Sequence, residues 1–208
     1  MKKILAFAVC LLTAAVAWAQ TPAEIVSRMD EEMNKHESEG IIMTMEIKIP
    51  LLGTVSSQNW IRDDRFRTEF SAKDIKYICW SDGKTTWTYN GKDNEVVIEN
   101  AKEDSSSGGA DDAKMLTGIT DGYDITLKKE TADAWYFLCK KSKTNPDGDD
   151  PKKMDLVVAK GTYYPKSLSA SMSGVTTTLR DIAFGVSDED LTFDAADYPG
   201  VKIVDKRK

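Results

Sequence analysis

The sequence is poor in the residues that most catalytic and metal sites require. It has one histidine, His36, and three cysteines among 208 residues. Serine and cysteine nucleophiles usually need a histidine partner, so either arrangement would depend on His36, at the polar end of an expected helix. The chain contains no HExxH and no CxxC motif, and no glycine-rich phosphate loop follows an expected strand. We therefore expect no enzyme activity, no metal site and no cofactor.

Basic residues are also fewer than acidic ones. The chain has 28 Lys and Arg residues against 34 Asp and Glu residues, a net charge of −6. Losing Lys2 and Lys3 with an N-terminal leader leaves 26 basic residues against 34 acidic ones, a net charge of −8. Nucleic-acid binding relies on a basic surface that contacts phosphates. This charge balance disfavours a nucleic-acid partner.

The N-terminus has the pattern of a secretory signal peptide. Lys2 and Lys3 form a positive region, Ile4–Ala17 is apolar, and Ala17-Trp18-Ala19 is an A-x-A cleavage site. The apolar run is short for a membrane span, which needs about 20 residues. We predict a signal peptide over 1–19, cleaved before Gln20, and one exported domain over 20–208.

Two cysteines, Cys79 and Cys139, remain in the expected mature chain. Both lie in strand-like apolar runs, and an exported protein meets an oxidising compartment. A disulfide closing a loop of this length would stabilise the fold by about 4 kcal/mol. Two separately buried thiols are the alternative, because free cysteine is often buried. The sequence leaves both states open.

The mature chain is expected to open with a helix. Thr21–Glu24 combines a capping threonine, a proline suited to the first turn and the glutamate of a capping box. Ile25, Met29 and Met33 follow at spacings of four and form one apolar stripe. The helix is expected to end near His36–Gly40.

A period of two begins at Ile41–Pro50 and indicates an antiparallel strand with one wet face. A turn is expected over 51–57, and Ala101–Asp112 is a polar Ser/Gly-rich tether that precedes a short helix over Ala113–Leu116. This short helix is either a lid or a plain connector. The further expected strands are Gln58–Ile61, Arg65–Phe70, the hairpin within Ile75–Tyr89, Glu95–Glu99, Tyr123–Leu127, Trp135–Cys139, Met154–Ala159, Ser167–Met172, Val175–Phe184, Leu191–Phe193 and Val201–Val204.

The hairpin over Ile75–Tyr89 has the strongest local signal. Asp-Gly at 82–83 between β-forming runs is typical of a two-residue type I′ turn. With these two residues as the loop, Ile78 is expected opposite Trp87. Alternation along the strands then gives one aromatic face, which must be covered by the protein's own core or by a ligand. That face is formed by Ile78, Trp80, Trp87 and Tyr89.

Several of these segments together resemble a known family. The two best motifs are Ser81-Asp82-Gly83-Lys84 followed by Trp87, Tyr89 and Asn90, and Phe193 followed by Pro199-Gly200-Val201 and Asp205–Lys208. With the leader, the amphipathic helix and the run of strands, they resemble in order the LolA family of periplasmic outer-membrane lipoprotein carriers. The similarity covers nearly all of the mature chain.

The resemblance implies an α+β, mainly β fold. Its core would be an incomplete, half-open antiparallel barrel of about ten or eleven strands, with an N-terminal helix and a short lid helix over the concave face. It also implies a periplasmic monomer that takes lipoproteins from an inner-membrane ABC exporter to an outer-membrane acceptor and holds their acyl chains in an apolar cavity. The residues assigned to that cavity are Met43, Met45, Ile47, Trp60, Phe66, Phe70, Ile78, Trp80, Trp87 and Tyr89.

The lid is assigned to both expected helices. Its residues are Ile25, Met29, Met33, Met115, Leu116 and Arg62. In the family an arginine after the aromatic strand latches the closed lid to the helices, and its counterpart here is Arg62 or Asp63. Two other functions stay open: a periplasmic lipid- or lipoprotein-sensing regulatory domain on the same fold, and a hydrolase on a curved sheet.

Overall fold

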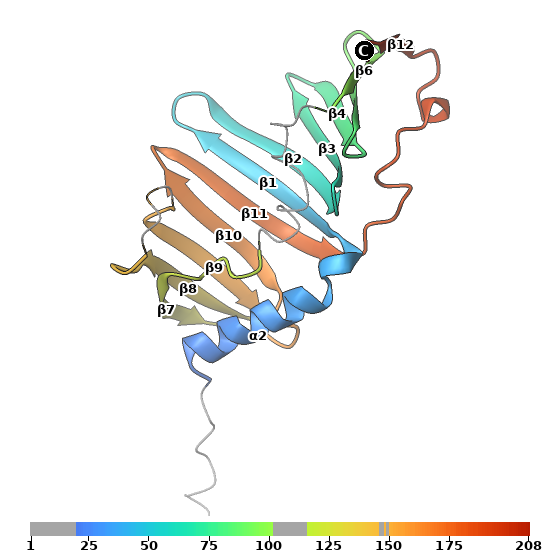
Figure 1. Cartoon of the computed structure of the whole chain (residues 1–208). Helices are drawn as coiled ribbons and strands as arrows, with labels where there is room; N and C mark the ends of the chain where they lie inside the picture. Colours follow the sequence, from blue (N-terminus) through green and yellow to red (C-terminus); the bar gives the residue numbers. More distant parts are fainter. Residues whose placement is uncertain (1–19, 102–115, 146–147, 149) are drawn as a thin grey trace, which may run out of the picture.

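A computed structural model describes residues 20–101, 116–145, 148 and 150–208 (Figure 1). In this part of the chain, one helix and two short 3-10 turns accompany a single twelve-stranded sheet. The helical elements are α2 (Pro22–Lys35), η1 (Glu37–Glu39) and η3 (Ala195–Asp197). The strands are β1 (Ile41–Ile49), β2 (Gly53–Arg62), β3 (Arg65–Ala72), β4 (Ile75–Ser81), β5 (Thr85–Asn90), β6 (Glu95–Asn100), β7 (Tyr123–Glu130), β8 (Ala134–Lys141), β9 (Lys153–Ala159), β10 (Pro165–Met172), β11 (Val175–Phe184) and β12 (Lys202–Asp205).

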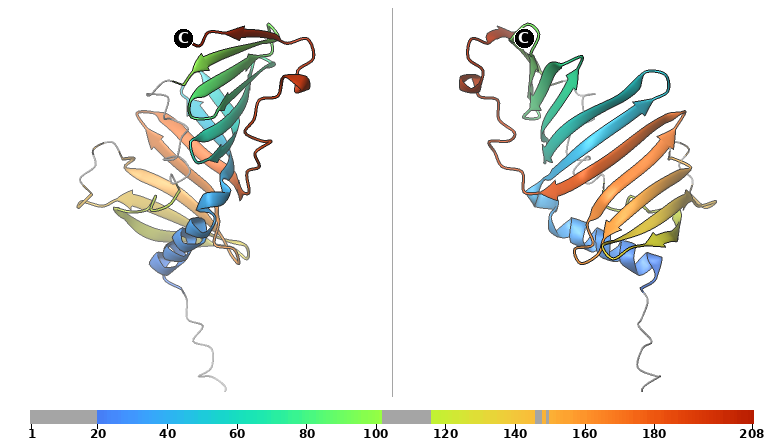
Figure 2. Two further views of the ribbon diagram at one scale, coloured as in Figure 1. Left: turned by 45° about the vertical axis from the view of Figure 1, so that its right-hand side comes forward. Right: turned by 180° about the vertical axis from the view of Figure 1, so that it is seen from behind.

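The sheet is open and runs in the order β12-β6-β5-β4-β3-β2-β1-β11-β10-β9-β8-β7. All of its pairs are antiparallel except β12 with β6, which are parallel. β1 and β11 join the two halves, and their register shifts between Ile42 and Thr44 at a β-bulge, a feature that bends a strand locally. Figure 2 shows the resulting curvature from two further sides. The expected mainly β, half-open antiparallel architecture with an N-terminal helix is confirmed.

Three expectations about the elements have a different outcome. The turn expected over 51–57 is wrong, because β2 already begins at Gly53. The strand expected over Leu191–Phe193 is also wrong, because this stretch has no partner strand among the described residues. The signal peptide and the helix over Ala113–Leu116, apart from Leu116 itself, lie outside the described residues.

The helices of the described chain fall short of the length and apolar character of a membrane span.

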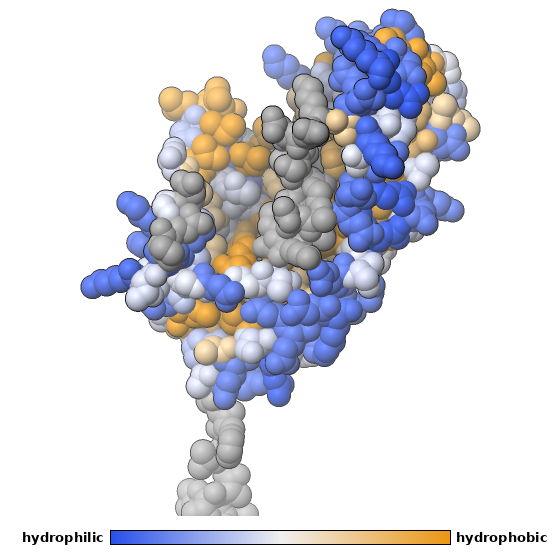
Figure 3. All heavy atoms as spheres, viewed as in Figure 1, coloured by the Kyte–Doolittle hydropathy of each residue, from blue (hydrophilic) through white to orange (hydrophobic). Residues whose placement is uncertain are grey.

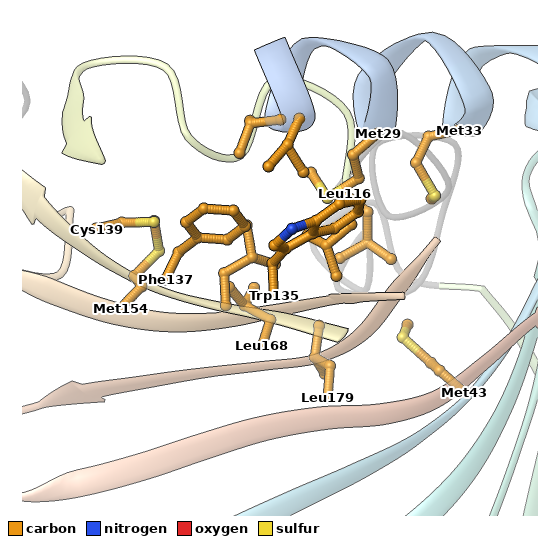
Figure 4. Packing of buried hydrophobic residues seen from close by; sticks show 14 of the residues in the cluster. Met29, Met33, Met43, Leu116, Trp135, Phe137, Cys139, Met154, Leu168 and Leu179 are labelled. Carbon is orange, nitrogen blue, oxygen red and sulfur yellow. The ribbon is translucent and has the colours of Figure 1, made fainter. Parts of the chain in front are cut away.

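Helix α2 begins as its sequence predicts. The backbone N–H of Glu24 donates to Thr21 Oγ1 at 3.2 Å, and the N–H of Thr21 donates to Glu24 Oε2 at 2.7 Å, which completes a capping box. The apolar stripe of the helix is almost fully buried against one face of the sheet (Figure 4). We call this the inner face, and the opposite side of the sheet the outer face.

A C-terminal segment, Val186–Val201, covers the outer face of β3, β4 and β5. The ring of Trp80 lies 5.3 Å from that of Phe193 and 5.8 Å from that of Tyr198, and Tyr89 lies 4.8 Å from Tyr198 (centroid distances). Trp80 is consequently buried to 2% exposure. The outer face therefore has an apolar cluster of its own, separate from the one under α2.

The β4–β5 hairpin differs from its expected register by two residues. Trp80 pairs with Trp87 and Ile78 with Tyr89, so the expected pairing of Ile78 with Trp87 is wrong. The turn is centred one residue later than expected because the Asp82 side chain accepts hydrogen bonds from the N–H groups of Lys84 and Thr85, at 2.9 and 2.7 Å. A shift of two leaves the faces unchanged, so these four side chains do share one face, as predicted.

Candidate ligand pocket

The inner face is built from apolar rows that cross several strands. One row follows the register from β8 through β9, β10 and β11 to β1, and it packs below α2. Its members are Phe137, Leu156, Leu168, Leu179 and Met45. The next row lies further along β1 from the end that adjoins α2, and it contains Cys139, Met154, Ala170, Thr177 and Ile47. Small side chains in the middle of this second row leave room above it.

A pocket of about 540 Å³ occupies that room. Its floor comes from both rows, and its walls come from the segment before β7 and from the loop before β9. The two walls are tied together, because Tyr123 Oη donates to the carbonyl oxygen of Pro151 at 2.8 Å. In Figure 3 apolar atoms are visible inside the hollow of this face. The lining residues are Gly118, Ile119, Asp121, Tyr123, Asp150, Pro151, Met154, Leu168, Ala170, Thr177 and Leu179.

Carboxylates lie at the pocket's edge and beside α2. Asp121 and Asp150 contribute to the lining, and Asn145 donates to Asp150 Oδ2 at 2.7 Å. Burial raises the pKa of the Asp30 carboxyl on α2, although the Gly118 N–H, which donates to it at 3.3 Å, opposes the rise, and the charge of Asp121 adds to it. This hydrogen bond joins the pocket wall to the helix.

The pocket has the chemistry of an apolar binding site. Among the described residues, no group of three His, Cys, Asp or Glu side chains is placed to hold a metal ion. His36 lies elsewhere: its ring stacks on Phe184 at 4.7 Å, with Nδ1 2.8 Å from Glu39 and Nε2 2.6 Å from Tyr164 Oη. The volume lies in the range of small-molecule sites, about 300–1,000 Å³. An alkyl chain suits such a lining better than a polar substrate does.

The residues assigned to the cavity from the sequence fall on two faces. Met43, Met45, Ile47, Phe66 and Phe70 lie on the inner face. Met43 is in the core beneath α2, and Met45 and Ile47 neighbour Leu179 and Thr177 of the pocket floor. The placement of the other five in an inner cavity is wrong. They are on the outer face: Trp60, Ile78, Trp80, Trp87 and Tyr89.

The reason for this correction is that strand alternation assigns side chains to two faces without identifying which face is inner. Trp60, Arg67, Trp80 and Trp87 pair in a row across β2 to β5, and the Arg67 guanidinium lies 4.8 Å from the Trp60 ring centre. The C-terminal segment covers the aromatic face at Trp80 and contacts Tyr89, whereas Trp60 and Trp87 are half-buried. The aromatic face provides no support for a ligand cavity.

The lid residues also divide. Ile25, Met29, Met33 and Leu116 belong to the cluster under α2, whereas Met115 lies outside the described residues. Whether the helix moves as a lid stays a prediction. Whether Arg62 latches the lid also stays a prediction. In the structure Arg62 Nη1 donates to the carbonyl oxygen of Val186 at 2.6 Å and Arg62 pairs with Asp188, so it holds the C-terminal segment. Asp63 is in the β2–β3 turn.

The pocket floor was missed by the sequence assignment, although a signal was present. Met154, Leu168 and Ala170 alternate with polar residues in segments that were expected to be strands. Their small or aliphatic side chains give a weaker local signal than the aromatic hairpin does. A search for apolar alternation in neighbouring strands, without weight on aromatics, identifies them.

The two cysteines are separate thiols in the structure. Burial raises the pKa of the Cys79 thiol, and burial with the charge of Asp155 raises the pKa of Cys139 to about 11. Because the thiolate is the reactive form, both thiols are less reactive at neutral pH than an exposed cysteine. Of the two open states, the structure has the pair of thiols.

Comparison with family models finds no match, and comparison with curated proteins finds none. Solved structures do resemble the chain. An uncharacterized conserved protein from Thermus thermophilus is 14% identical, with a TM-score of 0.45, over 90% of this chain and 100% of its own. A LolA superfamily protein from Nitrosomonas europaea is 12% identical, with a TM-score of 0.35, over 85% and 99%. Mycobacterium tuberculosis lipoprotein LppX is 10% identical, with a TM-score of 0.46, over 77% and 94%. These structures resemble this chain in fold, and its function has to be inferred from its own residues.

Proposed function

We propose that this protein is a periplasmic carrier that binds the acyl chains of lipoproteins in the inner-face pocket. The observation that supports this most directly is an apolar pocket of about 540 Å³ on the inner face, bounded partly by a segment that is tied to α2. Burying an acyl chain there contributes about 0.8 kcal/mol per CH₂. In this proposal the protein acts by binding, and its one histidine lies outside the pocket.

In this proposal the chain is exported by its N-terminal signal peptide and works as a monomer. It takes lipoproteins from an inner-membrane ABC exporter and delivers them to an outer-membrane acceptor. A reversible carrier must release what it binds, so opening the contact between α2 and the pocket wall offsets part of the gain from acyl burial. The bond from Gly118 to Asp30 is one of the contacts that opening would break.

The test uses two neighbouring residues of β11. Thr177 points into the pocket, whereas Thr178 lies on the outer face and its hydroxyl is 3.0 Å from that of Ser169. Thr177→Phe is expected to fill the pocket and to weaken binding of a fluorescent fatty acid at least about tenfold, because the probe loses much of its buried surface. Thr178→Phe adds the same ring outside the pocket and should bind like the wild type.

Both variants are compared by fluorescence titration after circular dichroism has established that they are folded. Native mass spectrometry of the purified wild type should also show bound lipid or lipoprotein, which Thr177→Phe loses. Equal affinity of the two variants, or no fatty-acid binding by the wild type, would contradict the proposal.

A further inference from the structure

The turn between β1 and β2 exposes two leucines completely. We call Pro50, Leu51 and Leu52 the leucine tip. Leu51 is 105% exposed and Leu52 82% exposed, the two highest values among the large apolar side chains described. Leu51 also has a φ of 65°, in the left-handed region that favours glycine or asparagine over a branched aliphatic residue. Neither leucine is buried in the fold, and Leu51 in addition takes a backbone conformation that is unfavourable for its side chain.

The leucine tip continues into an apolar strip that leads toward the pocket. Val55 and Met172 are 47% and 48% exposed, and both lie on the inner face. The β10–β11 turn that follows Met172 lies beside the tip, because a Cβ on Gly174 would be 3.6 Å from Pro50 Cγ. Half-buried Ile47 pairs with Thr177 of the pocket floor. An apolar path therefore connects the tip to the pocket.

The charge distribution around the tip is unlike that of the rest of the chain. Residues 47–62 and 156–180 contain no Asp or Glu, although the chain has 34 of them. These segments supply the tip and the turn beside it. Lys48 precedes the tip, and the neighbouring β3–β4 turn carries Lys73 and Asp74. Asp150 of the loop before β9 lines a hollow with Met172, so carboxylates are present nearby. Negative charge is absent from the tip itself and from the β10–β11 turn beside it.

We propose that the leucine tip inserts into the surface of a lipid bilayer and places the mouth of the pocket against it. Figure 3 shows the tip as an apolar projection at the upper left, and Figure 1 places it at the end of β1 remote from α2. A stable protein interface needs about 800 Å² from each partner, far more than a three-residue turn provides. A bilayer accepts a small apolar wedge without shape complementarity. This inference rests on the proposed acyl-binding function and adds the surface at which the pocket receives or releases acyl chains.

The experiment measures flotation of the full-length mature protein with vesicles of phosphatidylethanolamine and phosphatidylglycerol. The double variant Leu51→Ser/Leu52→Ser should lose vesicle partitioning by about tenfold or more, because two leucines no longer enter the bilayer. The control is Ile203→Ser on β12, which removes an apolar side chain of 48% exposure at an edge of the sheet. Ile203→Ser should float like the wild type.

A second measurement separates the tip from the pocket. A fluorescent fatty acid added from solution should bind the double variant with wild-type affinity, whereas its transfer from vesicles to that variant should be slower. If the fatty acid binds neither the wild type nor the double variant, the acyl-binding function fails. Flotation still decides the role of the tip.

Wild-type flotation by the double variant, or no flotation by the wild type, would overturn the role of the tip. A wild-type dimer that the double variant breaks, with no vesicle binding, would overturn it in favour of self-association. Light scattering after size exclusion distinguishes that case.

Discussion

Single residues in this sheet take their role from the face on which they lie. Trp80 and Cys79 are neighbours on β4, yet Trp80 packs under the C-terminal segment while Cys79 points to the inner face. The same holds for Thr177 and Thr178 on β11. Tryptophans on the outer face therefore stabilise the fold, and smaller side chains on the inner face form the proposed ligand site.

This division predicts the effect of removing the central ring of the outer cluster. Trp80→Ala should lower the free energy of unfolding by about 3–5 kcal/mol, the usual cost of truncating a buried aromatic side chain. Affinity for a fluorescent fatty acid should stay unchanged in the folded protein. Urea denaturation and fluorescence titration measure the two quantities. A variant that keeps its stability but loses the fatty acid would return Trp80 to the ligand site.

Among the elements, the C-terminal segment depends most on charge. Arg65 and Arg62 hydrogen-bond to Asp188 and, with their positive charges, lower the pKa of that carboxyl from 3.8. A pKa lowered by folding means that the ion pair contributes stability above pH 3.8, which is lost as the pH falls through the lower folded value. The segment should therefore loosen in acid.

Asp188→Asn should loosen the C-terminal segment already at neutral pH. It should also reduce the further loosening that acid causes in the wild type. Tryptophan emission as a function of pH reports this, because Trp80 becomes hydrated when Phe193 and Tyr198 move away. Glu189→Gln is the matched control, since it leaves both arginine contacts in place. An unchanged emission profile in Asp188→Asn would mean that packing alone holds the segment.

The sequence was sufficient to predict elements and insufficient to place them. The capping box and the stripe of Ile25, Met29 and Met33 predicted α2, and alternation predicted most strands, because both patterns depend on local spacing. The inner face could not be identified, because it depends on where α2 and the C-terminal segment return to the sheet. The alternation of Leu191 and Phe193 resembles that of a strand, but these residues are apolar because they cover the outer face of the sheet.

For the molecule as a whole, a ligand in the pocket should raise stability through linkage, since the pocket exists only in the folded state. A fatty acid at a hundredfold excess over its Kd adds about 2.7 kcal/mol. For a chain of this size that corresponds to several degrees in Tm. Differential scanning fluorimetry should show the shift in the wild type and in Thr178→Phe but not in Thr177→Phe. A shift of the same size in Thr177→Phe would place the fatty acid elsewhere.

The bulge between Ile42 and Thr44 lies where the two halves of the sheet meet, and in the described part of the chain the sheet ends at β7 and β12. Among the described residues, β7 and β12 are not hydrogen-bonded to each other, so the sheet is not closed into a ring. Bending at the β1–β11 bulge can therefore widen or narrow the space between the two halves of the sheet. Under the proposed acyl-binding function, one sheet would thereby accommodate ligands of different volume.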